Sequence, residues 1–360
     1  MSVLDLIRPE LQTITSYNTP GNELNCRLHN NELPWSPLEV ADGNLNRYPD
    51  KKKQLGLQQW LAENYRVSPS QLLLTRGSDD GIDLLMRLFL SEGKNSILQC
   101  TPTFPMYAFY ARLQRARILD CPLNEADGFT LSIDALFSTW EPDCKLIMLC
   151  RPNNPTGNLL DLATIATICN QYKNRSMVVV DEAYIEFSGA DSATILLSKF
   201  DNLIILRTLS KAYGLAGLRL GCVMSGESII NALKNIMPPY TLSSPVMALA
   251  NQALTDKAWF ASSINKIIAS RERLLIQLKQ IPVIDRVFDS FGNFVLIKSQ
   301  KARELANCFA ENGIAIRSFA DPGPLASMLR FSIGDESQHL RLLALLDRRH
   351  CEEHSDEAIQ

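Results

Sequence analysis

Short apolar runs alternate with stretches of helical periodicity through the middle of the chain. Each run has the length of a buried strand, and the stretch that follows it is long enough for a crossover helix. We therefore predict an α/β core built on a mostly parallel sheet. The predicted strands are residues 72–74, 97–99, 146–149, 177–180 and 203–206.

The first predicted helix follows the first of these strands. Its apolar positions recur at intervals of three and four residues, which places them on one face of a helix. Ser78 precedes them and has a side chain typical of an N-cap. We therefore expect the helix to begin just after Gly77. The apolar positions are Ile82, Leu85, Met86 and Phe89.

The pattern changes near Pro282 to that of a small α+β unit. Its predicted strands are residues 283–288, 293–297, 314–316 and 329–333, with a helix at 302–312 and a closing helix after the last strand. Prolines interrupt the first 45 residues, which show little periodicity. We predict four parts: an N-terminal arm that joins the small domain in part (1–45), a large domain (46–275), a small C-terminal domain (276–346) and a disordered tail (347–360).

Composition narrows the class of protein. A chain of 360 residues, 46% hydrophobic and 21% charged, is large enough for two domains. Its formal net charge of -3 gives no broad positive field, so we expect neither nucleic acid nor a membrane as its partner. The nine cysteines include no C-x-x-C pair, and no signal-like segment opens the sequence. We therefore expect a cytoplasmic protein.

The tail contains a motif that resembles a zinc site. Residues 350–354 read HCEEH, which fits the H-x-x-E-H pattern of some zinc peptidases. Such a site also needs a third ligand and a buried helix, and the polar sequence after His354 offers no apolar face for packing. We therefore predict no metal site.

The strongest chemical signal follows the strand predicted at 203–206. Lys211 stands there among hydroxyl side chains and glycines, in the segment TLSKAYGLAGLRLG at 208–221. Ligands of open α/β sheets bind at the carboxyl ends of the strands. A lysine at that place can lose its proton and form an imine. Taken alone, a solvated loop lysine is the more common explanation.

Three further polar segments follow predicted strands. Asp181 begins DEAYIEF at 181–187, where a carboxylate can pair with a protonated ring nitrogen and Tyr184 can reach a ring oxygen. Asn154 lies in the rigid turn RPNNPTG at 151–157. The segment RGSDDG at 76–81 opens a helix, whose free N–H groups can bind a phosphate. An ion pair at the sheet edge is the structural alternative for Asp181, and an ordinary turn or helix start is the alternative for the other two.

These segments, with LNRYP at 45–49 and LRFSIG at 329–334, resemble the class I and II aminotransferases of fold type I, and among them most closely the histidinol-phosphate aminotransferases. The resemblance extends over nearly the whole chain. It implies a large domain with a mostly parallel seven-stranded sheet between helices, a small α+β domain, pyridoxal 5′-phosphate as the cofactor, and a homodimer.

The resemblance also implies a role for each matching residue. Lys211 would form the imine with the cofactor and then act as base and acid, while Asp181 would pair with the pyridine nitrogen. Asn154 and Tyr184 would hydrogen-bond the ring oxygen O3′. Phe104 holds the position that stacks on the ring, where close relatives often carry tyrosine. The residues implied around the cofactor phosphate are Ser78, Asp79, Thr208, Ser210 and Arg219, with Tyr48 reaching in from the other subunit.

At the substrate side, the resemblance implies Arg330 as the ligand of the carboxylate, together with Asn154, and Arg317 and Tyr17 on the phosphate side. For Arg330, Arg317 and Tyr17, an ordinary surface contact is the alternative. The implied reaction transfers the amino group of L-histidinol phosphate to 2-oxoglutarate and yields imidazole acetol phosphate and glutamate, a step of histidine biosynthesis. The partners would thus be a phosphorylated amino alcohol and a 2-oxo acid.

Other functions remain open on the same fold. An aromatic amino acid aminotransferase or a threonine-phosphate decarboxylase would share the cofactor residues and differ in the substrate pocket. A non-catalytic ligand-binding relative would lack the lysine or the aspartate, and both are present. The glycines at 214, 217 and 221 do not make G-x-G-x-x-G, which argues against a dinucleotide-binding oxidoreductase.

Overall fold

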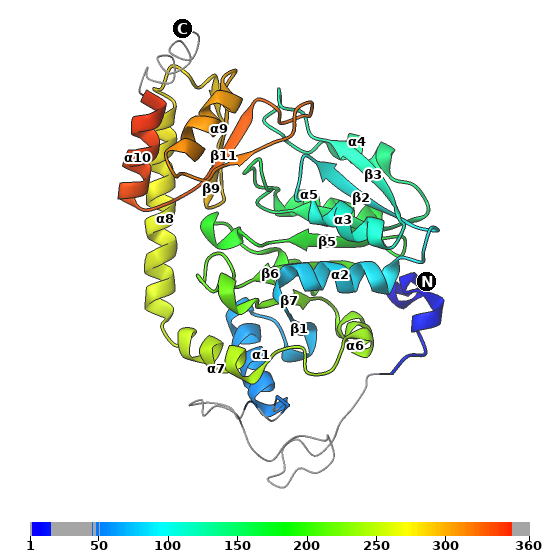
Figure 1. Cartoon of the computed structure of the whole chain (residues 1–360). Helices are drawn as coiled ribbons and strands as arrows, with labels where there is room; N and C mark the ends of the chain where they lie inside the picture. Colours follow the sequence, from blue (N-terminus) through cyan, green and yellow to red (C-terminus); the bar gives the residue numbers. More distant parts are fainter. Residues whose placement is uncertain (1, 16–44, 46–47, 50, 348–360) are drawn as a thin grey trace.

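The structure is a computed structural model that describes residues 2–15, 45, 48, 49 and 51–347. A seven-stranded sheet flanked by helices carries a smaller four-stranded sheet at one end (Figure 1). The strands are β1 (Leu72–Thr75), β2 (Ser96–Thr101), β3 (Arg117–Pro122), β4 (Cys144–Cys150), β5 (Met177–Asp181), β6 (Leu203–Thr208), β7 (Gly221–Met224), β8 (Arg286–Val287), β9 (Phe294–Lys298), β10 (Arg317–Ser318) and β11 (Met328–Ser332). The α-helices are α1 (Lys51–Tyr65), α2 (Gly77–Phe89), α3 (Met106–Leu113), α4 (Ile133–Thr139), α5 (Leu162–Gln171), α6 (Glu227–Ile236), α7 (Ser244–Ala253), α8 (Lys257–Leu278), α9 (Ala302–Glu311) and α10 (Glu336–Asp347).

The large sheet is mostly parallel. Its order is β1-β7-β6-β5-β4-β2-β3, and only β7 runs antiparallel to its neighbours. All five predicted strands are present, and β3 and β7 are additional. The carboxyl ends of β1, β2, β4, β5 and β6 therefore meet at one edge of the sheet, where a ligand site is expected.

Helices cover both faces of the large sheet because the strand side chains alternate between two apolar cores. On β5, Val178 and Val180 belong to the core beneath α1, α4, α5 and α7. Met177 and Val179 belong to the opposite core, beneath α2, α3 and α6. Continuous apolar strands of this kind are typical of a sheet buried on both faces. The predicted α/β class is therefore confirmed.

Helix α2 begins earlier than expected. Ser78 is the second residue of α2 and not its N-cap, so the prediction of a Ser78 cap is wrong. Arg76 holds the N-cap position, and its backbone N–H donates to the carboxylate of Asp80 at 3.0 Å. The Asp80 side chain thus takes over the role of a capping group. This leaves the first N–H groups of α2 facing the carboxyl edge of the sheet.

The small sheet has the order β10-β11-β9-β8, with antiparallel pairs throughout. Its core is formed with α8, α9 and α10, and α8 runs from the large part of the molecule along this sheet (Figure 1). The predicted α+β unit is present. Two of its strands differ from the prediction: β10 lies just after the predicted 314–316, and β8 is only two residues long.

The described N-terminal residues form two short 3₁₀ helices, Val3–Leu6 and Pro9–Leu11. Val3, Leu6 and Ile7 are buried in the core beneath α2 and α6. The remainder of the predicted arm and the HCEEH motif lie outside the described residues. Within the described part of the chain, no helix has the length and apolarity needed to cross a membrane, and no cluster of side chains could hold a metal ion.

Candidate active site

A pocket of about 100 Å³ lies at the carboxyl edge of the large sheet. We call it the inner pocket, and it brings together residues from five segments that are far apart in the sequence. Its lining consists of Ser78, Asp79, Phe104, Cys150, Asn154, Asp181, Ala183, Tyr184, Thr208, Ser210, Lys211 and Arg219. Ten of these twelve residues were predicted, and the others are Cys150 and Ala183. The fold therefore explains why residues after separate strands share one site.

One wall of the inner pocket is suited to an anion. The backbone N–H groups at the start of α2 have no partners within the helix, and the positive end of the helix dipole lies there. The guanidinium of Arg219 lies close by, donating to Ser210 Oγ at 3.3 Å and to Asp79 Oδ2 at 3.4 Å. Thr208 Oγ1 donates to the same Ser210 hydroxyl at 3.0 Å. Ser210 and Arg219 are thereby held together on one side of the pocket.

Close packing of backbone segments forms this wall. Gly221, at the start of β7, lies against the first turn of α2, where an added Cβ would be only 2.6 Å from the Gly77 carbonyl carbon and 2.7 Å from the Ser78 nitrogen. Gly77 has φ +79°, and a Cβ there would meet the guanidinium of Arg219 at 2.9 Å. Arg219 itself has the left-handed φ of 52°. The glycines thus allow the helix start and the arginine to approach each other.

Asp181 is a buried carboxylate at the end of β5, with 2% of the residue exposed. Tyr107 Oη donates to Asp181 Oδ2 at 2.8 Å, and the backbone N–H of Ala183 donates to Oδ1 at 3.1 Å. Burial raises the pKa of Asp181 to about 6, although these two hydrogen bonds act in the opposite direction. The carboxylate therefore has neutral donors but no cation bonded to it within the described residues.

Lys211 lies just beyond the end of β6 in the same pocket. Its Nζ is 5.7 Å from the centre of the Tyr184 ring. Desolvation in the pocket is the main cause that lowers the pKa of Lys211, and the positive charges of Arg330 and Arg219 add to the effect. A lowered pKa increases the fraction of neutral amine, which is the nucleophilic and basic form.

Asn154 connects the inner pocket to the small sheet. Its Nδ2 donates to Tyr184 Oη at 3.4 Å, and its Oδ1 accepts from the guanidinium of Arg330 on β11. Phe294 on β9 packs its ring edge-to-face with Tyr184 at 5.1 Å and lies beneath the Arg330 guanidinium at 5.2 Å. Arg330 therefore lies at the rim of the inner pocket, although it is 176 residues from Asn154 in the sequence.

Arg317 lies directly opposite Arg330, because the two residues are paired in the register of β10 and β11. Burial lowers the pKa of Arg330, and the charge of Arg317 acts in the same direction. Neither arginine forms an ion pair with any residue among 51–347. Like charges on facing strand residues repel each other, so an anion placed between them would be stabilised.

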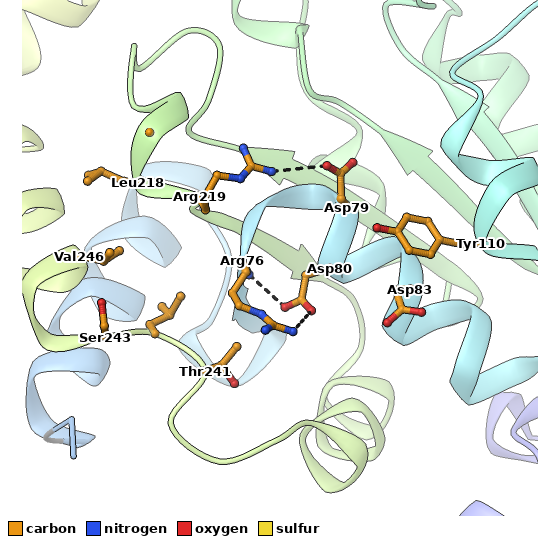
Figure 2. Close-up of a pocket in the computed structure, with 12 residues that line it drawn as sticks. Arg76, Asp79, Asp80, Asp83, Tyr110, Leu218, Arg219, Thr241, Ser243 and Val246 are labelled. Atoms are coloured by element: carbon orange, nitrogen blue, oxygen red, sulfur yellow. Dashed lines mark hydrogen bonds and ion pairs between the residues drawn. The ribbon is translucent and has the colours of Figure 1, made fainter. Parts of the chain in front are cut away.

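Of the predicted residues that the structure describes, Tyr48, Arg317 and Arg330 are not among those that line the inner pocket. Tyr48 stacks on Tyr240 of its own chain, with ring centres 4.4 Å apart. Tyr17 lies outside the described residues. A second pocket, of about 580 Å³, adjoins the inner one and shares Asp79 and Arg219 with it. In Figure 2, the ion pairs of Arg219 with Asp79 and of Arg76 with Asp80 lie along this outer pocket.

Sequence reasoning missed two aromatic residues at the site. Tyr107 is three residues after Phe104 and bonds to Asp181, and Phe294 supports both Tyr184 and Arg330. Neither residue directly follows the carboxyl end of a strand, so the sequence carried no signal for them. Their roles depend on how α3 and β9 pack against the large sheet.

Fold and site together define an α/β enzyme whose lysine shares a pocket with a buried carboxylate and an anion-binding wall. The family model of class I and II aminotransferases matches residues 19–346. The chain therefore belongs to the class I and II aminotransferase family, as the sequence motifs predicted.

Within this family, the chain is similar to histidinol-phosphate aminotransferases. The chain is 47% identical over 346 residues to histidinol-phosphate aminotransferase 1 of Legionella pneumophila (strain Lens), covering 96% of this chain and 95% of that one. The histidinol-phosphate aminotransferase structure from Clostridium acetobutylicum has a TM-score of 0.77 at 23% identity, covering 84% of this chain and 90% of that one. The Sinorhizobium meliloti enzyme, solved in complex with pyridoxal-5′-phosphate, has a TM-score of 0.75 at 24% identity, covering 84% and 82%. These two structures support the fold.

Proposed function

We propose that this chain is a pyridoxal-phosphate-dependent aminotransferase that acts on L-histidinol phosphate and 2-oxoglutarate and yields imidazole acetol phosphate and glutamate. The similarity to the Legionella pneumophila relative, 47% identical over 96% of this chain, carries this proposal. The inner pocket supports it with chemistry of the required kind, because an amine, a carboxylate and an anion-binding wall line one space.

The described residues fit pyridoxal phosphate. Asp181 is buried with neutral donors alone, so a protonated ring nitrogen would supply the positive partner it lacks. Arg219 and the free N–H groups of α2 suit the phosphate, with Ser210 and Thr208 as further donors. When bound, the cofactor supplies an aldehyde that condenses with amines and a ring that accepts electrons.

Each of these residues would then have a separate role in the reaction. Lys211, freed as an amine when the substrate nitrogen replaces it on the cofactor, would take the proton from the adjacent substrate carbon and deliver it to the neighbouring cofactor carbon. Asp181 holds the ring nitrogen in its protonated form. Asn154 and Tyr184 bind the ring oxygen, and Phe104 covers the ring face. The second half-reaction would use the same groups in reverse on a 2-oxo acid. This predicts ping-pong kinetics.

Substrate selection would depend on the paired arginines. Arg330, at the pocket rim, would bind the carboxylate of glutamate and 2-oxoglutarate, with Asn154 beside it. Arg317, on the facing strand, would bind the substrate phosphate, and we propose that Tyr17 assists it. Two adjacent guanidiniums suit a phosphate ester or a dicarboxylate better than an aromatic amino acid.

A comparison of amino donors tests the proposal. Purified protein loaded with pyridoxal phosphate should form glutamate from 2-oxoglutarate fastest with L-histidinol phosphate, more slowly with phenylalanine, and not at all in the Lys211→Ala variant. Release of CO₂ from threonine phosphate would indicate the decarboxylase instead. If phenylalanine reacts faster than histidinol phosphate, the proposed substrate is wrong.

We also propose a homodimer in the cytoplasm, with the domain boundaries 46–275 and 276–346 and the N-terminal arm at 1–45. In this dimer, Tyr48 would reach the cofactor phosphate of the other subunit through the outer pocket, where Arg219 is accessible. Mixing the inactive variants Tyr48→Ala and Lys211→Ala should restore about a quarter of wild-type activity, because random hybrids contain one complete site. No recovery in confirmed hybrids would contradict a shared site.

A further inference from the structure

Tyr107 forms a contact with the site that the proposed function does not use. Its side chain projects from α3 into the core beneath α2 and is fully buried. Its ring packs edge-to-face with Phe104 at 5.6 Å, and its hydroxyl lies 2.8 Å from Asp181 Oδ2. The hydroxyl must be the donor, because an ionised carboxylate only accepts.

The phenol remains a donor across the usual pH range. Burial raises the pKa of Tyr107 well above its ordinary value, and the neighbouring Asp181 charge adds to this effect. Burial likewise raises the pKa of the nearby Cys150 thiol to about 12. Burial, and to a smaller extent the charges of Asp79 and Glu182, raise the pKa of Asp181, whereas the hydrogen bonds from Tyr107 and Ala183 lower it.

Within the described part of the chain, Tyr107 therefore supplies the one side-chain hydrogen bond that Asp181 accepts. The backbone N–H of Ala183 holds the other carboxylate oxygen. With one donor on each oxygen, the carboxylate plane is fixed, and the second lone pair of an oxygen stays free for a partner in the inner pocket. A hydrogen bond to an ionised group is stronger than one to a neutral group, so the contact favours the ionised form.

We propose that Tyr107 is a positioning residue that holds Asp181 in the orientation and the ionised form in which it faces the ring nitrogen. Tyr107 touches neither cofactor nor substrate in this role. The inference rests on the proposed function, because the role given there to an ionised Asp181 is to pair with a protonated ring nitrogen.

The first test uses protein without cofactor. Tyr107→Phe removes one oxygen and keeps the packed ring, and Tyr172→Phe, another buried tyrosine outside the pocket, is the control. Unfolding by urea is followed between pH 4.5 and pH 8. The factor by which Tyr107→Phe raises the unfolding equilibrium constant should be about 10- to 100-fold larger at pH 8, where Asp181 is ionised, than at pH 4.5. In the Asp181→Asn background this pH dependence should disappear.

The second test uses the cofactor. The pH below which affinity for pyridoxal phosphate falls should move up by about one unit or more in Tyr107→Phe, while affinity above pH 8 stays near that of Tyr172→Phe. The role of Tyr107 would be overturned if Tyr107→Phe had the same pH profile as Tyr172→Phe in both tests. It would also be overturned if the pH dependence caused by Tyr107→Phe persisted in the Asp181→Asn background. A wild-type protein that binds no pyridoxal phosphate would instead overturn the proposed function, and the urea comparison would still decide the role of Tyr107.

Discussion

Gly221→Ala should damage the anion-binding wall through backbone packing alone. The added Cβ would lie 2.6 Å from the Gly77 carbonyl carbon, 2.7 Å from the Ser78 nitrogen and 2.8 Å from the Arg207 carbonyl oxygen. All three atoms are backbone, so no side-chain rotation can relieve the contacts. To reach 3.0 Å, below which real Cβ contacts essentially do not occur, Gly77 must move by 0.4 Å (3.0 − 2.6).

The expected cost follows from this displacement. Overpacking of a tight core typically lowers the free energy of unfolding by about 1–3 kcal/mol. The same movement shifts the Ser78 N–H group, which we propose binds the cofactor phosphate. We expect affinity for pyridoxal phosphate to fall by about tenfold or more, since small misplacements of binding groups are costly.

The assay is a titration of cofactor-free protein with pyridoxal phosphate, followed by the visible absorption band, together with urea unfolding. Gly217→Ala is the matched control, because it lies in the same segment and an added Cβ there meets nothing within 4 Å. The reasoning would be refuted if Gly221→Ala matched Gly217→Ala in both affinity and stability. A loss of stability with unchanged affinity would remove Ser78 from the phosphate site.

Two further predictions concern charge. Burial raises the pKa of Asp181 from 3.8 to about 6, so the folded cofactor-free protein holds a proton between these pH values that the unfolded chain has released. The stability from this protonation is fully present below pH 4 and lost as the pH rises through 6. In urea unfolding, the stability of Asp181→Asn relative to wild type should therefore increase by up to about 3 kcal/mol between pH 4 and pH 7, and a constant difference would contradict the pKa. Arg317→Gln should raise KM for histidinol phosphate by about tenfold and KM for 2-oxoglutarate less, with kcat largely kept, because an exposed guanidinium contributes to binding. Steady-state kinetics check this, and unchanged KM values would argue against a phosphate role for Arg317.

The strands found from the sequence share one physical property. β4, β5 and β6 are buried on both faces, so their apolar runs are continuous and easy to recognise. β3 lies at the sheet edge and alternates exposed and buried residues, including Arg117 and Asp120. β7 is only four residues long and begins with a glycine. A half-exposed strand, and a short strand that begins with glycine, give a weaker apolar pattern than β4, β5 and β6.

Some residues of the candidate site could likewise be predicted from the sequence, and others could not. Lys211, Asp181 and Asn154 could be predicted because each follows a strand, and parallel strands end at one sheet edge. The contact of Tyr107 with Asp181 could not, because it depends on how α3 packs against β5. The Ser78 cap was wrong: α2 begins at Gly77, and the N–H group of Arg76 at the N-cap position donates to the Asp80 side chain.

The central claim is that Lys211 forms the covalent link to the cofactor in the pocket it shares with Asp181. Loaded protein can be reduced with borohydride, which makes this link permanent, then digested and analysed by peptide mass spectrometry. The account predicts that the cofactor mass lies on Lys211 and disappears in Lys211→Ala. A modification found on another lysine, or loaded yellow protein without any adduct at Lys211, would contradict it.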